Sequence, residues 1–213
     1  GSCCNNSLWN QIGQDIEGLS SSDDGGKAVA INGDGTIVAF GSPEDESTPP
    51  IAGNVQIFSD SNGTWVPMGS VIFNNSINGN EDFGQALSFS LDGTILAVGA
   101  PRATINGLQS GKVVVYQFDG NDWIQMGQTI DGQNTYDWTG CAVSISHDGN
   151  TLAIGSPNST GFTSVYNFNG TSWIQLGQDI VLGGSAGYSV SLSSDGNTLA
   201  IGDPAPGLGN TYV

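Results

Sequence analysis

The stretch FGQALSFSLDGTILAVGAP, residues 83–101, decides the fold because the chain contains four similar versions of it. Aligned on an Asp-Gly pair, the copies are AVAINGDGTIVAFGSP (28–43), ALSFSLDGTILAVGAP (86–101), AVSISHDGNTLAIGSP (142–157) and SVSLSSDGNTLAIGDP (189–204). Before the pair, apolar residues alternate, which is typical of a strand with one buried face. Asp-Gly favours a two-residue hairpin turn. The run after it is apolar on both faces, as in an inner strand. Each copy therefore predicts a strand, a tight turn and a returning strand.

A second element follows each of the first three copies and ends in a strand that carries tryptophan. Its versions are NVQIFSDSNGTWVPMG (54–69), KVVVYQFDGNDWIQMG (112–127) and TSVYNFNGTSWIQLG (163–177). Four of the five tryptophans, Trp9, Trp65, Trp123 and Trp173, stand 56, 58 and 50 positions apart. A period near ~50 residues with four antiparallel strands per repeat is typical of β-propeller blades. The alternative is a plain β-sandwich with chance similarity between its strands.

The two ends of the sequence suggest how such a ring closes. The last repeat lacks its tryptophan strand, whereas the chain begins with an unaccompanied one, LWNQIG (8–13). Pairing the two would complete the last blade and remove an open sheet edge. We therefore predict an all-β fold, a β-propeller of four four-stranded blades closed by the N-terminal tryptophan strand. Two alternatives stay open: the four blades belong to a longer ring, or the edge strand comes from a neighbouring chain.

The predicted domain organisation is simple. Residues 1–7 form a polar lead, and residues 8–213 form one propeller domain. Counted from each tryptophan strand, the repeats run over about 8–64, 65–122, 123–172 and 173–213.

The charge of the chain excludes several classes of partner. Of 213 residues, 20 are Asp or Glu and only 3 are Lys or Arg, which gives a net charge of −17. Nucleic acid requires basic side chains, and anionic membrane surfaces attract them. No apolar run reaches the ~18 residues of a membrane span. We expect neither nucleic-acid binding nor membrane insertion, and the acidity serves either solubility or divalent cations.

Sequons and cysteines favour an extracellular protein. Asn-x-Ser/Thr occurs five times, at Asn5, Asn62, Asn74, Asn158 and Asn169. Asn62 and Asn169 are predicted at the same hairpin tip of different repeats, where a glycan is sterically allowed. The cysteines are Cys3, Cys4 and Cys141. An odd number outside the cell suggests intermolecular pairing, here through Cys3 and Cys4, against the alternative of reduced terminal thiols and an inert buried Cys141.

The long loops predict a candidate binding face. In four-stranded blades the short hairpins share one face of the ring, and the longer loops share the other. Binding residues often lie on loops that a rigid scaffold carries. The candidate residues are Asp23, Asp24, Glu44, Asp45, Glu46, Glu81, Asp82, Asp137 and Trp138, with Asp203 nearby. A merely solvated rim is the alternative.

The repeat resembles the FG-GAP repeat of integrin α-subunit propellers. Phe83-Gly84 and Gly99-Ala100-Pro101 carry both ends of that motif, whereas the other copies keep Gly-x-Pro and replace the phenylalanine. The resemblance implies a propeller with an extracellular role in recognition or adhesion. The family often binds Ca²⁺ in the first hairpin of a blade, but these hairpins have too few carboxylates for such a cage. We read Asp34, Asp92, Asp148 and Asp195 as turn formers, and expect no metal site and no cofactor, with loosely held Ca²⁺ at the acidic loops as an alternative.

Catalytic motifs are weak. His147, the only histidine, is predicted at a hairpin tip away from the acidic loops, which gives it no partner for a catalytic triad. No Cys/His spacing resembles a zinc site. The leading hypothesis is a non-enzymatic, acidic, glycosylated propeller at the cell surface, which assembles with copies of itself or other chains, as in a fibre or surface layer, or mediates adhesion. The alternatives are a lectin-like propeller that binds glycans and, with less support, a glycoside hydrolase.

Overall fold

The computed structural model describes residues 9–19, 24–43, 53–74, 81–158, 160–204 and 209–213. It is all-β in this part of the chain and forms four antiparallel sheets. The first sheet contains β1 (Ala28–Ile31), β2 (Ile37–Ser42), β3 (Asn54–Asp60), β4 (Trp65–Pro67) and β5 (Ile72–Phe73). The second contains β6 (Ala86–Phe89), β7 (Ile95–Ala100), β8 (Lys112–Phe118), β9 (Trp123–Gln125) and β10 (Ile130–Asp131). The third contains β11 (Ala142–Ile145), β12 (Thr151–Ser156), β13 (Phe162–Phe168), β14 (Trp173–Gln175) and β15 (Ile180–Val181). The fourth contains β16 (Ser189–Leu192), β17 (Leu199–Asp203) and β18 (Asn210–Tyr212).

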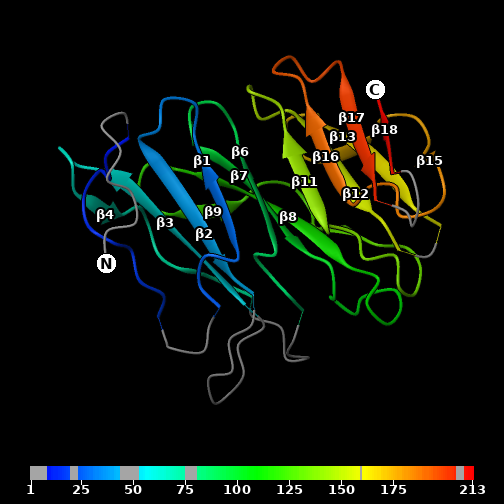
Figure 1. Cartoon of the computed structure of the whole chain (residues 1–213), viewed down its shortest axis with the longest axis horizontal. Coiled ribbons are helices and arrows are strands. Elements are labelled where there is room, and N and C mark those ends of the chain that lie inside the picture. Colours follow the sequence, from blue (N-terminus) through cyan, green and yellow to red (C-terminus); the bar gives the residue numbers. More distant parts are fainter. Residues whose placement is uncertain (1–8, 20–23, 44–52, 75–80, 159, 205–208) are drawn as a thin grey trace.

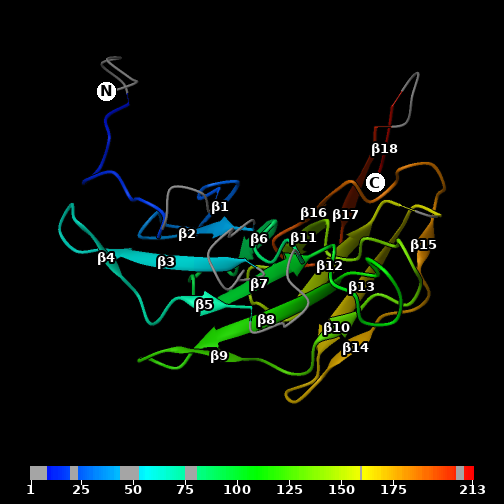
Figure 2. The ribbon, with the colours of Figure 1, turned by 90° about the horizontal axis from the view of Figure 1, so that it is seen from below.

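The sheets stack side by side in chain order. Their first strands form a row in which β1 is next to β6, β6 next to β11, and β11 next to β16 (Figure 1). Viewed from below, the sheets fan out from this row (Figure 2). The tryptophan strands β4, β9 and β14 lie at the edges of the sheets that are farthest from the row. The first and fourth sheets are therefore the two ends of the stack.

Two apolar cores hold the stack together. One contains residues of the first and second sheets, and the other contains residues of the second and third. Strand β7 contributes to both: Leu96 and Val98 belong to the first core, whereas Ile95 and Ala97 belong to the second. This alternation follows from the two-residue period of a strand. We call the side of a sheet that faces the preceding sheet its front face, and the opposite side its back face.

The predicted hairpins form, but the Asp-Gly turns differ from the prediction. The loop between β1 and β2 covers residues 32–36, longer than a two-residue turn, and only Gly35 of the Asp-Gly pair has a positive φ. The Asp34 carboxylate accepts a hydrogen bond from the Thr36 N–H, which makes the aspartate the turn former that the sequence predicted. At Asn62-Gly63, both residues have positive φ, as a two-residue hairpin requires.

The N-terminal strand lies elsewhere than predicted. Within the described residues, the fourth sheet has three strands, and the segment around Trp9 does not pair with β18. It lies against the first sheet instead, because Trp65 donates its indole N–H to the Ile12 carbonyl at 2.9 Å and exchanges two hydrogen bonds with the Gln14 side chain. The ring that the sequence predicted is thus open between β1 and β16.

Candidate interaction surfaces

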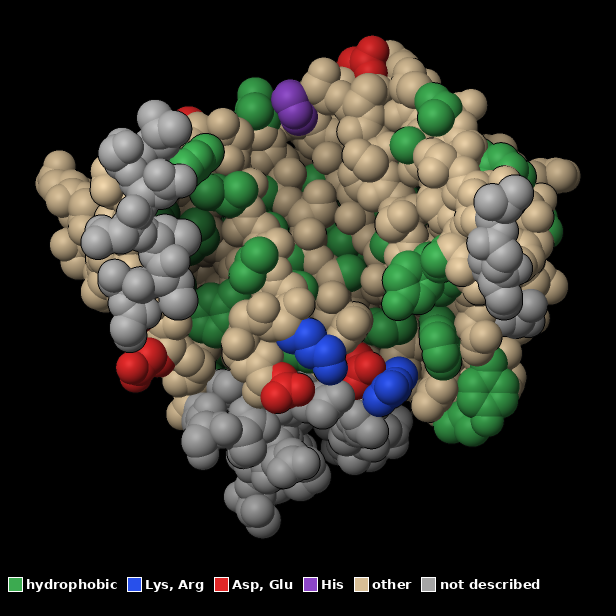
Figure 3. Space-filling model, in the orientation of Figure 1, with side chains coloured by type: hydrophobic (Ala, Val, Ile, Leu, Met, Phe, Trp, Pro, Cys, Tyr) green, Lys and Arg blue, Asp and Glu red, His purple; other side chains and the backbone are tan. Residues whose placement is uncertain are grey.

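A groove of about 560 Å³ opens between the N-terminal segment and the front face of the first sheet. The described residues that line it are mainly apolar, with no charged residue among them; they comprise Gln11, Ile12, Gln14, Ile16, Gly26, Val29, Ala30, Ile31, Val38, Ala39, Phe40 and Trp65. Hydrophobic side chains are visible at the surface over β1 (Figure 3). Such an open apolar surface is typical of a binding site.

The front face of the first sheet has the sequence of a buried face, but its two β1 side chains are exposed, whereas Phe40 on β2 is buried. In the second sheet Leu87 pairs with Val98 and Phe89 with Leu96; in the first, Val29 pairs with Phe40 and Ile31 with Val38. The relative exposure is 9% for Phe89, whereas it is 73% for Val29 and 62% for Ile31. The difference arises because none of the sheets in the described part of the chain covers the first one from the front.

The back face of the fourth sheet is the opposite open surface. In the first three sheets, Gly41, Gly99 and Gly155 are buried so closely against the next sheet that a Cβ would collide with the carbonyl oxygens of Gly84, Gly140 and Gly187. Gly202 occupies the same position in the fourth sheet, and a Cβ on it would meet no other sheet. The glycine that permits a close approach is present, but within the described residues no other sheet approaches it.

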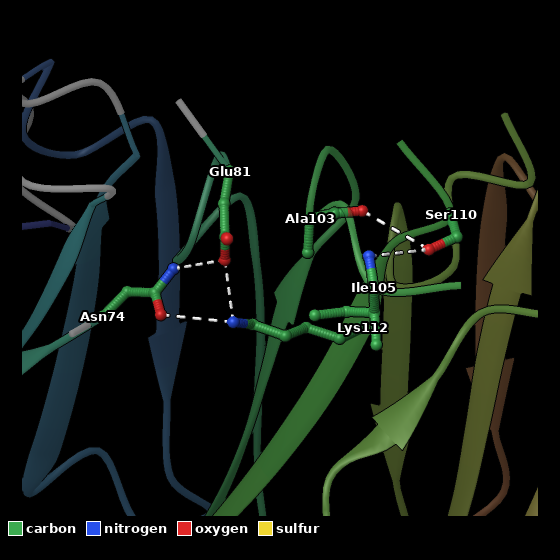
Figure 4. Close-up of polar contacts among 6 residues, drawn as sticks. All are labelled: Asn74, Glu81, Ala103, Ile105, Ser110 and Lys112. Atoms are coloured by element: carbon green, nitrogen blue, oxygen red, sulfur yellow. Dashed lines mark hydrogen bonds and ion pairs between the residues drawn. The ribbon is translucent and has the colours of Figure 1, made fainter. Parts of the chain in front are cut away.

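The predicted acidic face proves to be largely internal. Glu81 is buried and pairs with Lys112 at 2.7 Å, and its carboxylate also accepts from the Asn74 amide at 2.7 Å (Figure 4). Asp82 is buried beside Arg102, at 3.2 Å. Charged side chains of both signs gather at this lower edge of the molecule (Figure 3). These carboxylates fix loops, because each has a protein partner.

The other predicted residues of that face are partly buried, partly exposed and partly outside the described residues. The buried Asp137 carboxylate accepts from the Asn134 N–H at 2.8 Å, and that of Asp203 accepts from the Ser185 N–H at 3.0 Å. Trp138 is half-buried, has a φ of 56° and donates its indole N–H to the Gln109 side chain. Asp24 is exposed near Lys27. Four predicted residues, Asp23, Glu44, Asp45 and Glu46, lie outside the described residues.

Two of the predicted glycosylation sites are open to a glycan. Asn62 and Asn169 are exposed at hairpin tips. The Asn74 amide nitrogen, to which a glycan would attach, donates to Glu81 instead. Asn158 is half-buried, and Asn5 lies outside the described residues, as do Cys3 and Cys4. Cys141 is a free, half-buried thiol whose pKa is raised by burial.

A small polar cavity of about 80 Å³ lies between residues of the second and third sheets. Asp131 lines it, with a carboxyl pKa that burial raises despite the nearby Lys112. Asp179 also lines it and accepts hydrogen bonds from Ser164 and Gln175. Within the described residues no group of three or more His, Cys, Asp or Glu side chains could hold a metal ion. The same part of the chain has no helix long and apolar enough to cross a membrane.

Comparisons with known proteins bear on the fold. No protein-family model matches the chain, and no curated protein matches it. Among solved structures it is similar to TolB from Acinetobacter baumannii (20% identity, TM-score 0.50, 86% of this chain and 39% of that one). It is also similar to the hydrazine synthase of Kuenenia stuttgartiensis (15% identity, TM-score 0.57, 93% of this chain and 47% of that one). These likenesses support a propeller-like arrangement of the sheets. The chain spans less than half the length of either protein.

Proposed function

We propose that this protein is a non-enzymatic, extracellular interaction module, in which propeller blades associate with other protein chains through the open ends of the stack. The observation that carries the proposal is the exposure of Val29 and Ile31, whose equivalents in the inner sheets are core residues or pack against the core. Burial of such side chains is the main favourable term in protein association. The two ends of the stack are therefore the surfaces on which the function depends.

Several observations favour an extracellular setting. The net charge is −17, the exposed sequons at Asn62 and Asn169 leave room for glycans, and the FG-GAP resemblance implies recognition or adhesion outside the cell. Cys3 and Cys4 are candidates for intermolecular disulfides that would lock an assembly. The structural neighbours include a protein named as a synthase, which leaves the activity open because a shared fold does not define a function.

A ring closed within one chain, as the sequence predicted, is the competing arrangement. It would cover Val29 with the back face of the same chain's fourth sheet and leave no end surface for a partner. The structure favours the open stack, because β1 and β16 lie at its opposite ends.

A second candidate function is lectin-like binding at the loop face. It is favoured by the aromatic pair Tyr136 and Trp138, which both have positive φ, with Tyr136 exposed. Strained backbone at exposed residues is a recurrent feature of ligand sites. A glycan array tests it: binding that disappears in Tyr136→Ala supports the lectin, and an array without binding rejects it.

The proposed function is tested by the mass of the secreted protein in solution. We would measure sedimentation velocity over a wide concentration range, with and without reductant, for the wild type and for Val29→Asp. The matched control is Ile124→Asp, since Ile124 is exposed on the outer strand β9. Association that Val29→Asp weakens by at least ~10-fold, and Ile124→Asp does not, supports the proposal. A protein that remains a single copy and binds no other chain contradicts it.

A further inference from the structure

The hairpin tips of neighbouring sheets form a ladder of backbone hydrogen bonds. The Gly33 N–H donates to the Leu91 carbonyl, the Leu91 N–H to the His147 carbonyl, and the His147 N–H to the Ser194 carbonyl, at 2.8, 3.0 and 3.0 Å. These residues hold the same position in the four repeats. Within the described residues, the ladder ends with an unused donor, the Ser194 N–H, and an unused acceptor, the Gly33 carbonyl. The fourth sheet thus has a donor, and the first sheet an acceptor, with which the same ladder could continue between two copies.

A second series of contacts, between each tryptophan and the preceding sheet, is incomplete in the same direction. The indole N–H groups of Trp65, Trp123 and Trp173 donate to the carbonyls of Ile12, Met68 and Met126 at 2.8–2.9 Å. Each indole also covers the glycine after that carbonyl: Gly13, Gly69 or Gly127. The fourth member of the series, Leu176-Gly177, has no indole over it within the described part of the chain. Trp9 is the remaining tryptophan of the series, and it is 78% exposed.

The two uncharged faces match as well. Gly26 is the first-sheet equivalent of Gly84, Gly140 and Gly187, which pack on the glycines of the sheet before them, and it lies in the open groove. Its counterpart is the uncovered Gly202. Around Gly202, the back face carries only small uncharged side chains, among them Ser189, Ser191 and Ala200, to receive Val29 and Ile31.

We propose that the fourth sheet of a second copy, β16–β18, packs its back face against the front face of the first sheet of the first copy, at the groove beside the N-terminal segment. This inference rests on the proposed function and identifies the partner. In the assembly the Ser194 N–H donates to the Gly33 carbonyl of the other copy. Trp9 of the first copy covers Leu176-Gly177 of the second. Residues Ile16-Glu17 of the first copy pair with β18 of the second, in the way that β15 pairs with β13 within one copy. The N-terminal segment thus provides, between copies, the outer strand that the fourth sheet lacks.

Charge favours this route of association over others. Each copy has a net charge of −17, so two copies repel each other, most strongly at low salt. The described residues that line the groove include no Asp or Glu. The residues that would face them, Ser189, Ser191 and Ala200, are also uncharged. Val29 and Ile31 can therefore meet the surface around Gly202 without burying a carboxylate there, and the carboxylate of the contact is Glu17, which is exposed in the single copy.

The contact is head-to-tail, since a front face meets a back face. Such heterologous contacts close into a ring when the rotation allows it. Two copies would contribute eight sheets, which lies within the usual range of about four to eight propeller blades.

Photo-crosslinking between isotopically distinct copies tests this arrangement. A benzophenone amino acid replaces Val29, in a background that carries Cys3→Ser and Cys4→Ser, and ¹⁴N and ¹⁵N copies are mixed before irradiation. We expect crosslinks that join position 29 of one isotope to a peptide of residues 189–203 of the other. The control carries the benzophenone at Ile124 and should give no such product.

Three results would overturn the proposal, and they distinguish it from the proposed function. Crosslinks from position 29 to residues 189–203 within one copy would mean that the ring closes inside the chain. Association without that crosslink would mean that copies meet elsewhere, and the proposed function would survive. A single-copy mass at every concentration, with no other chain bound, would remove both.

Complementary variants test the head-to-tail direction. Val29→Asp blocks the front end and Ser191→Asp blocks the back end, so each variant alone should associate at least ~100-fold more weakly than the wild type. An equimolar mixture should recover dimers, because one intact front face then meets one intact back face. A mixture that stays dissociated would contradict the head-to-tail contact.

Discussion

Strands β6 and β1 have the same length, the same pairing and nearly the same sequence pattern, yet one is buried and the other is open. Phe89 in β6 is 9% exposed, whereas its equivalent in β1, Ile31, is 62% exposed. The difference lies in the neighbouring sheet, because the first sheet covers β6, whereas no sheet formed by the described residues covers β1. Burial in a stacked fold is thus a property of position in the stack, and a core-like face at an end indicates an absent neighbour.

The largest expected effect comes from truncating equivalent isoleucines. Ile145→Ala, in the third sheet, removes a core side chain that is 5% exposed and should lower the free energy of unfolding by ~2–5 kcal/mol. Ile31→Ala, at the same position of the exposed first sheet, should cost less than ~1 kcal/mol in a single copy. Urea unfolding at a concentration where the protein is not associated measures both. Equal losses would contradict the comparison.

Adding a methyl group to equivalent glycines should separate the two ends of the stack next. Gly155→Ala places a Cβ against the Gly187 carbonyl, so we expect a loss of ~1–3 kcal/mol from overpacking. Gly202→Ala meets only the Ser189 side chain and should change the stability of a single copy little. Thermal unfolding of the two variants decides. If Gly202→Ala proves as costly as Gly155→Ala, another sheet already lies against it.

Removing an indole N–H should have an effect no larger than that of the added methyl group, again only where a neighbour is present. Trp173→Phe loses the hydrogen bond to the Met126 carbonyl at a side chain that is 2% exposed. Because the carbonyl is then left without that donor, stability should fall by ~1–3 kcal/mol. Trp9→Phe should leave the single copy unchanged. Chemical denaturation tests the pair, and a clear loss in Trp9→Phe would show that Trp9 is engaged within the copy.

The smallest contrast is expected at the hairpin tips, because they are local structures. Hydrogen bonds from Ser193 and Asn197 lower the Asp195 pKa from 3.8 to about 2, and those from Ser146 and Asn150 also lower the Asp148 pKa. A lowered folded-state pKa stabilises the protein above the unfolded value, and this contribution is lost as the pH falls from about 4 towards 2. Carboxyl NMR titration should place both midpoints below 3.8, in an end sheet and in an inner sheet alike. A normal value at Asp195 alone would mean that its turn is not formed.

The repeating parts of the fold could be predicted from sequence, because they depend on neighbouring residues in the chain. The strand pattern, the position of the hairpins and the tryptophan period all follow from residues within one repeat. The Asp-Gly loops proved longer than predicted, since only the glycine takes a positive φ. Asp34 nevertheless stabilises the turn as expected, because its carboxylate accepts a hydrogen bond from the Thr36 N–H.

The surfaces could not be predicted, because they depend on residues far apart in the sequence. Glu81 looked like a loop carboxylate until the fold brought Lys112 to it, 31 positions later. Trp9 could equally have completed the last sheet, and only the hydrogen bonds between Trp65, Ile12 and Gln14 place its segment on the first. One signal in the sequence could have predicted the tryptophan contacts. The spacing between each of these tryptophans and the following Gly is constant, which relates Gly177 to Gly13, Gly69 and Gly127.

Amide hydrogen exchange at low and high protein concentration tests most directly whether the two ends of the stack are unfilled blade interfaces that a second copy occupies. We predict that protection rises with concentration in residues 9–17, in β1 and in β16–β18, whereas β6 and β11 stay equally protected throughout. Exchange that is independent of concentration at both ends, or added protection confined to the acidic loops, would contradict the account.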